Sequence, residues 1–260
     1  MAILERNDKG PVAHLRLNAP ARLNALSDEM LAALMDQIDA LADDPNIRVV
    51  ILSGAGKVFC AGHDLKQMTA GRQAPDGGRG YFADLFQRCT AVMTGLQTLP
   101  QPVIAKVHGL ATAAGCQLVA TCDLAVAATG TRFGVNGVNI GLFCSTPMVA
   151  LSRNIPRKQA FEMLTTGEFI DAGRAQSLGL INRVVEPEHL DAETDALAAT
   201  LAAKLTSAVR IGKQAFYQQL HMGLEQAYAH TGAVMVENML DADTAEGIAA
   251  FIEKRPPDWK

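Results

Sequence analysis

Apolar residues recur along this 260-residue chain with two different periods, and their order predicts an α/β fold. Residues 11–18 alternate apolar and polar side chains, which is typical of a half-buried strand. Short apolar runs at 48–53 and 103–107 predict strands that are buried on both faces. The segments 123–128 and 180–185 predict two further strands.

Helices are predicted where apolar residues are spaced three and four positions apart. Ser27 and Asp171 stand directly before two of these segments, where their side chains can cap a helix. The polar, Gly-rich residues 74–80 predict a mobile loop, and 132–146 is too irregular to assign. In this part of the chain the predicted helices are 28–42, 81–99, 157–165 and 172–178.

After residue 188 the strand pattern ends and only helical spacing continues. No internal repeat, low-complexity tract or Pro/Ser-rich linker separates this region from the rest. We therefore expect a core over residues 1–200 and a C-terminal helical module over residues 201–260, which docks on the core or on a neighbouring subunit. Four helices are predicted after residue 188, at 192–205, 208–220, 224–240 and 244–253.

Composition and charge indicate which partners and which cellular compartment to expect. The net charge is -4 with a pI of about 5.9 and no basic block, which argues against binding nucleic acid. The five cysteines are odd in number and follow no metal-ligand spacing, so we expect free thiols, a reducing compartment and no metal. The N-terminus lacks the apolar run of a signal peptide, and no stretch reaches the roughly 20 apolar residues of a membrane span. These features predict a cytoplasmic protein.

The stretch 109–123, GLATAAGCQLVATCD, reads as a small-residue loop that leads into a helix. Ala113, Ala114 and Gly115 would let a ligand approach backbone N–H groups that a helix start leaves without intrahelical partners. Such a turn can hold an oxyanion, although small residues at a helix start more often serve close packing.

Two segments with this spacing resemble the crotonase, or enoyl-CoA hydratase/isomerase, superfamily. They are VFCAGHDLKQM at 58–68 and PVIAKVHGLATAAGCQLVATCD at 102–123. The resemblance extends to Pro-x-x-x-Asn-Ala-Leu at 20–26, Ala-x-x-x-Gly-Leu at 175–180 and the terminal helix at 251–255. The runs GHDLK, GLATAAGCQLVA and GLFCSTP place the chain close to one subgroup of that superfamily.

The resemblance implies a spiral of ββα turns, a C-terminal helical part that forms a trimer or a dimer of trimers, and an acyl-CoA thioester as ligand. Coenzyme A then enters as part of the substrate, and no separate cofactor is implied. The family's two oxyanion-hole amides correspond to the backbone N–H groups of His63 and Ala114. The implied CoA contacts are Ala61, His63, Asp64, Leu65, Lys66 and Ala114, with Phe251 and Lys254 reaching a neighbouring subunit's CoA.

The chain departs from the family at both catalytic acids. Hydratases use two glutamates to hold water and move protons, and the corresponding residues here are Gln117 and Gly137. An amide does not titrate usefully and glycine has no side chain, so we expect hydration of an enoyl-CoA to be near background. A gain of hydration in a Gln117→Glu, Gly137→Glu double variant would show that only the acids are missing.

Several alternatives stay open. Decarboxylation, isomerisation and thioester hydrolysis each use an enolate-stabilising or oxyanion-stabilising hole, and a non-catalytic acyl-CoA-binding protein would keep the fold without turnover. The His63 side chain is a candidate proton donor, since decarboxylase-like relatives carry His there. Cys144 and Ser145 are weaker candidates as nucleophiles, and Asp123 suggests a structural role.

Overall fold

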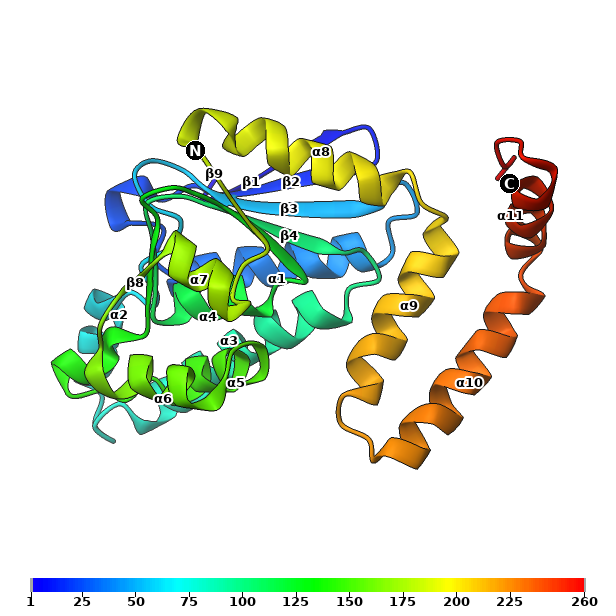
Figure 1. Ribbon diagram of the computed structural model, residues 1–260. Coiled ribbons are helices and arrows are strands. Elements are labelled where there is room, and N and C mark those ends of the chain that lie inside the picture. The colour runs from blue at the N-terminus through cyan, green and yellow to red at the C-terminus, as the bar shows by residue number, and fades with distance from the viewer. Residues whose placement is uncertain (1, 260) are drawn as a thin grey trace.

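A six-stranded sheet forms the centre of the computed structural model, which describes residues 2–259 (Figure 1). Its strand order is β1-β2-β3-β4-β6-β9; β1 and β2 form an antiparallel hairpin, and the other neighbours are parallel. The strands are β1 (Leu4–Lys9), β2 (Val12–Leu17), β3 (Val49–Gly54), β4 (Val103–Val107), β6 (Leu124–Ala128) and β9 (Arg183–Val185).

A second, smaller sheet contains β5 (Leu110–Thr112), β7 (Arg132–Gly134) and β8 (Ile170–Asp171). The chain visits the two sheets in turn: β4 leads to β5 and a helix, and β6 leads to β7 and further helices. An isolated bridge between Cys60 and Ala111 joins the segment after β3 to the edge of the small sheet. The fold is therefore a succession of ββα turns, as the family resemblance implies.

Helices cover both faces of the large sheet. Figure 1 shows α8 over one face and α1, α3 and α4 over the other. The face under α8 has its own small core, in which Ile51 and Ile104 are buried together with Leu197. The helices are α1 (Asp28–Ala42), α2 (Leu65–Gly71), α3 (Arg79–Thr98), α4 (Ala114–Thr121), α5 (Ser145–Asn154), α6 (Arg157–Thr166), α7 (Ala172–Leu178), α8 (Leu190–Ala202), α9 (Thr206–Gln219), α10 (Leu224–Leu240) and α11 (Ala242–Glu253), with short 3-10 helices η1 (Pro20–Arg22), η2 (Asn136–Ile140) and η3 (Pro187–His189).

The α/β class and most of the predicted elements are confirmed. Residues 74–78 form turns, and α3 begins at Arg79, two residues before its predicted start. The Asp76 carboxylate accepts from the amides of Gly78 at 2.9 Å and Gly80 at 2.8 Å. The sequence did not predict the strands β1, β5 and β8 or the helices α2 and α5. The irregular stretch 132–146 contains β7 and η2.

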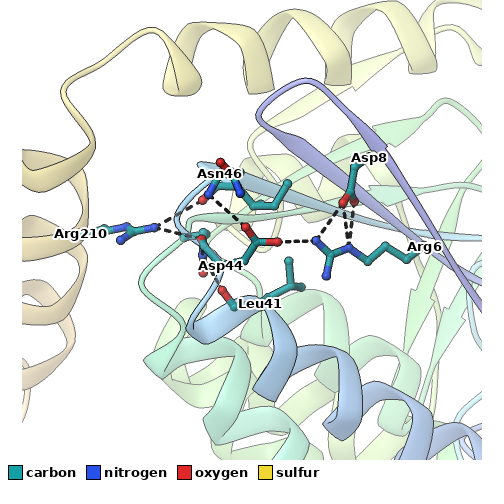
Figure 2. A network of polar contacts seen from close by, with 8 residues as sticks. Arg6, Asp8, Leu41, Asp44, Asn46 and Arg210 are labelled. Carbon is teal, nitrogen blue, oxygen red and sulfur yellow. Dashed lines mark hydrogen bonds and ion pairs between the residues drawn. The ribbon is translucent and has the colours of Figure 1, made fainter. Parts of the chain in front are cut away.

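Partly buried polar contacts attach α9 to the rest of the chain. Figure 2 shows Arg210 reaching from α9 to the turn after α1, where its guanidinium donates to the carbonyl oxygens of Asp44 at 3.4 Å and Ile47 at 3.5 Å. The Asp44 carboxylate in turn accepts from Arg6 of β1 at 2.8 Å. This network ties α9, the α1–β3 turn and the first strand together.

A second attachment of α9 centres on Asp123, at the start of β6. Its carboxylate accepts from Lys213 Nζ at 2.7 Å, from Tyr217 Oη at 2.8 Å and from the Val103 amide at 2.6 Å. Both side chains of the Asp123–Lys213 ion pair are largely buried. Asp123 therefore has the structural role that its position suggested.

Beyond α9 the chain forms an arm. Helix α10 packs on α9 and α11 packs on α10, and no side chain of α10 is fully buried in this chain. None of the helices within residues 2–259 is long and apolar enough to cross a membrane. The division at residue 200 stays a prediction. Several large apolar side chains of the arm are exposed, namely Leu224, Tyr228, Met235, Val236, Met239, Leu240, Ile248, Phe251 and Ile252.

Candidate active site

The loop after β3 and the start of α4 touch each other through glycines. A Cβ at Gly115 would lie 2.2 Å from the carbonyl oxygen of Cys60, and one at Gly62 would lie 3.0 Å from the Ala113 Cβ. Gly62 also has a positive φ of 88°. Only residues without a Cβ allow so close an approach of two backbones. The two segments that the sequence singled out are thus brought together.

The turn into α4 is held in an unusual backbone conformation. Ala113 has φ 50° and ψ -119°, which costs a non-glycine residue about 1–3 kcal/mol. The surroundings fix it: the Ala113 amide donates to the Gly134 carbonyl at 2.9 Å, and Thr112 Oγ1 donates to Asn136 Oδ1 at 2.5 Å. Strain of this kind is characteristic of functional turns.

Two backbone amides stand free at this contact. Ala114 is the first residue of α4, so its N–H has no intrahelical acceptor. Neither Ala114 N nor His63 N donates to any acceptor within residues 2–259. The ideal Cβ of Gly62, directly before His63, would lie 3.2 Å from Ala114 N, so the two amides belong to adjoining backbone segments. Two such donors can bind one oxygen that gains negative charge.

Gln117 lies one helical turn beyond Ala114. It is 6% exposed, and its Oε1 is buried without a hydrogen-bond partner within the described residues. An unpaired buried polar atom costs roughly 1–3 kcal/mol, which a bound ligand or water would recover. The structure therefore supports a polar function for Gln117 beside the free amides.

Gly137 is not simply a position that has lost an acid. A Cβ there would lie 2.3 Å from the Leu142 carbonyl oxygen and 2.8 Å from Cys144 Sγ. Residues 141–144 fold back over η2, and the Leu142 amide donates to the Gly137 carbonyl at 2.9 Å. The segment occupies the space that a glutamate would need, so a side chain at position 137 would have to displace residues 141–144.

The His63 side chain is held by its neighbours. Its Nδ1 lies 3.4 Å from the Leu26 carbonyl oxygen, and its ring packs edge-on against Phe86 with centroids 5.8 Å apart. Burial lowers the pKa of His63, the nearby Arg88 adds to this, and the hydrogen bond to Leu26 opposes it. Since a carbonyl only accepts, Nδ1 carries the proton of the neutral ring, and the buried Nε2 is left without a partner.

The residues expected to contact CoA differ in their surroundings. Asp64 caps α2 by accepting from the Lys66 amide at 2.9 Å, and it lies 3.5 Å from Arg22 Nη1. Ala61 is half-buried, Leu65 is 53% exposed, and the Lys66 side chain is also exposed.

The two C-terminal CoA candidates lie elsewhere in the chain. Phe251 is 85% exposed on α11, and Lys254 follows directly at that helix's C-terminus. Figure 1 shows α11 on the opposite side of the molecule from α2. Within a single chain, these two residues do not join the site.

The buried thiols have packing roles, and Ser145 lies in a local turn contact. All five cysteines are free and buried, and burial raises the pKa of Cys60 and Cys116 to about 12. Burial also raises the pKa of Cys144. Ser145 Oγ donates to the Phe143 carbonyl at 3.4 Å. A neutral thiol is a weak nucleophile, so the geometry favours the amides over Cys144 as the chemical centre.

Comparison with known proteins decides the family. Residues 7–260 match the family model for enoyl-CoA hydratase/isomerase. The chain belongs to this family. It is 50% identical over 248 residues to the Xenopus laevis protein "Enoyl-CoA hydratase domain-containing protein 3, mitochondrial", covering 95% of this chain and 83% of that protein. The human protein of the same name is 47% identical, with 95% and 80% covered.

Solved structures agree with this assignment. The human enoyl coenzyme A hydratase domain-containing protein 3 superposes with a TM-score of 0.94 at 45% identity, covering 99% of this chain and 100% of the other. An enoyl-CoA hydratase from Mycobacterium smegmatis gives 0.96 at 54% identity, with 100% and 99% covered. The crotonase fold and the resemblance to this subgroup are thereby confirmed.

The expected location is corrected by the same comparison. Relatives from four vertebrates at 47–50% identity are named as mitochondrial proteins. These names point to mitochondria and contradict the cytoplasmic location inferred from the N-terminus. Composition could not supply this information, because transit peptides are amphipathic rather than apolar.

Proposed function

We propose that this protein binds an acyl-CoA thioester and polarises its carbonyl with the backbone amides of His63 and Ala114. The supporting observation is the pair of unpartnered N–H groups on two loops that touch at Gly62 and Gly115. Removing one such donor in other enzymes costs roughly 3–4 kcal/mol of transition-state stabilisation. The chemistry is that of a thioester enolate, in keeping with membership of the enoyl-CoA hydratase/isomerase family.

Hydration of an enoyl-CoA is not the reaction we propose. Each positioned acid or base contributes roughly 10²- to 10⁴-fold to a rate, and neither Gln117 nor Gly137 supplies one. A reaction that needs the oxyanion hole but not two carboxylates fits better, which favours decarboxylation, isomerisation or thioester hydrolysis. The alternative is an acyl-CoA-binding protein without turnover.

The rest of the proposed complex follows the family. Coenzyme A is part of the substrate, with Ala61, Asp64, Leu65 and Lys66 along its path. The exposed apolar side chains of α10 and α11 support a homotrimer or a dimer of trimers, because a single chain leaves them uncovered. In that assembly Phe251 and Lys254 would reach a neighbour's CoA. Light scattering measures the subunit number.

The test is turnover and binding with a mixed acyl-CoA panel, followed by mass spectrometry. Crotonyl-CoA hydration by the wild type is expected near background, while several acyl-CoA esters bind. Gln117→Glu restores a single titratable group, and Gln87→Glu, on the exposed surface of α3, is the matched control. Wild-type hydration at about 10 per second or more would contradict the proposal, as would failure to bind any ester.

A further inference from the structure

The N-terminus of α4 is a region of positive potential. Gln117 and Gly137, which stand nearby in the proposed site, supply no carboxylate to balance it. The helix has eight residues, its first turn contains no acidic residue, and no side chain caps it. A helix N-terminus carries about half a positive charge, and the free amides of His63 and Ala114 add donors beside it. His63 itself is neutral, because burial lowers its pKa.

The acidic side chains around the His63 loop already have polar partners in the protein. Asp64 caps α2 and lies 3.5 Å from Arg22, and Asp28 lies 2.7 Å from Arg88. Glu29 accepts from Gln67 Nε2 at 3.1 Å, and hydrogen bonds lower its pKa. These three carboxylates are thus engaged by other partners rather than by the amides of His63 and Ala114.

Gln117 is a buried polar side chain one helical turn beyond the free Ala114 amide. It follows Ala114 by three residues, so the two lie on the same face of α4, and helical side chains tilt toward the N-terminus. Its Oε1 is buried without a hydrogen-bond partner within residues 2–259. No protein contact to this oxygen therefore fixes the orientation of the amide, so a bound ligand determines whether Oε1 or Nε2 faces it.

We propose that Gln117 is a specificity-determining residue that binds a carboxylate on the acyl group, so that the substrate class is a carboxyacyl-CoA, the thioester of a dicarboxylic acid. This inference rests on the proposed acyl-CoA function and deepens it. Nε2 of Gln117 donates to the carboxylate while the thioester oxygen takes the two backbone amides. A glutamate at position 117 would repel such a group, whereas the neutral amide accepts it.

The Gln117 amide could bind either a carboxylate or a hydroxyl group on the acyl chain, and charge distinguishes the two. A hydroxyl would satisfy either end of the Gln117 amide, but it gains little from the helix N-terminus. A carboxylate gains both a charge-assisted hydrogen bond and the favourable potential. The structure thus favours an anionic acyl group over a hydroxylated one.

The experiment is isothermal titration of the full chain with malonyl-CoA, butyryl-CoA and 3-hydroxybutyryl-CoA, with mass spectrometry to verify that each ester is intact. The wild type is expected to bind malonyl-CoA at least about tenfold more tightly than butyryl-CoA, as one charge-assisted hydrogen bond allows. Gln117→Met should lose this preference, and Gln117→Glu should reverse it. Gln87→Glu, outside the proposed site, should keep both the wild-type affinity for butyryl-CoA and the wild-type preference for malonyl-CoA.

The outcomes distinguish failure of the carboxylate assignment from failure of the proposed acyl-CoA binding. Equal binding of malonyl-CoA and butyryl-CoA, tighter binding of 3-hydroxybutyryl-CoA, or a malonyl preference that persists in Gln117→Met would overturn the carboxylate assignment and leave acyl-CoA binding intact. If none of the three esters binds to the wild type, the proposed function itself fails. Thermal melting of each variant verifies that it is folded, and Gln117→Glu supplies a near-isosteric variant if Gln117→Met unfolds.

Discussion

Replacing Gly115 with alanine tests the contact that brings the two free amides together. The added Cβ would lie 2.2 Å from the Cys60 carbonyl oxygen and 2.8 Å from its carbonyl carbon. Both are backbone atoms, so no side chain can rotate away. Real Cβ contacts essentially never fall below 3.0 Å, so the segments must separate by roughly 0.8 Å.

Two consequences follow from that separation. Overpacking of this kind costs about 1–3 kcal/mol, which corresponds to a fall in Tm of roughly 2–12 °C for a chain of this size. A misplacement of about 1 Å at a catalytic donor costs roughly 10²-fold in rate, and the proposed hole depends on both amides. We therefore expect Gly115→Ala to lose turnover of the substrate that the panel identifies, and to bind acyl-CoA esters more weakly.

The assay pairs thermal melting with acyl-CoA titration, and Gly173→Ala in α7 is the control. A Cβ at Gly173 meets only Asp171 Oδ1 at 3.5 Å, an ordinary contact, so both properties should be near wild type. If Gly115→Ala melts and binds as the wild type does, the close contact of the two loops does not determine the site. A loss of stability with unchanged binding would likewise refute the link to function.

Three further predictions concern stability. Lys213→Met leaves the buried Asp123 carboxylate without its cation and should lower the free energy of urea unfolding by about 3–5 kcal/mol, whereas the exposed Lys158→Met should change it little. Burial lowers the pKa of His63 in the folded state, so the unfolded chain takes up a proton first as the pH falls. The free energy of unfolding should therefore decrease below about pH 6.5, and His63→Phe should remove this pH-dependent loss. Gly137→Ala should lower the free energy of unfolding by about 1–3 kcal/mol, because its Cβ would clash with Leu142. An unchanged Tm would show that residues 141–144 move aside without cost.

Local signals explain why much of the fold could be predicted from the sequence. Helix α1 begins and ends where its apolar spacing indicates, and Ser27 Oγ accepts from the Met30 amide at 3.3 Å as a cap should. Strand β1 was missed because its sequence, LERNDK, is mostly polar and only Leu4 is buried, so its pairing with β2 relies on the backbone. The short helix α2 depends on the Asp64 cap rather than on an apolar stripe.

The site was only partly predictable for a different reason. The small residues at 113–115 indicate a close approach, but nothing local shows that the approaching group is the Cys60 backbone. Only the family resemblance linked the two loops. The same comparison treats Gly137 as a lost acid, while the fold-back of the Leu142 carbonyl onto it is a tertiary contact without a periodic signal. The orphaned Gln117 amide also becomes visible only once burial is known.

The central claim is that the His63 and Ala114 amides polarise a thioester carbonyl. The direct measurement is isotope-edited infrared spectroscopy of butyryl-CoA labelled with ¹³C at the thioester carbon, free and bound to the wild type. Two hydrogen bonds to the oxygen weaken the C=O bond, so the bound ester should absorb at lower frequency than the free one, and Gly115→Ala should diminish the shift. A saturably bound ester whose carbonyl frequency equals that of the free ester would contradict the account.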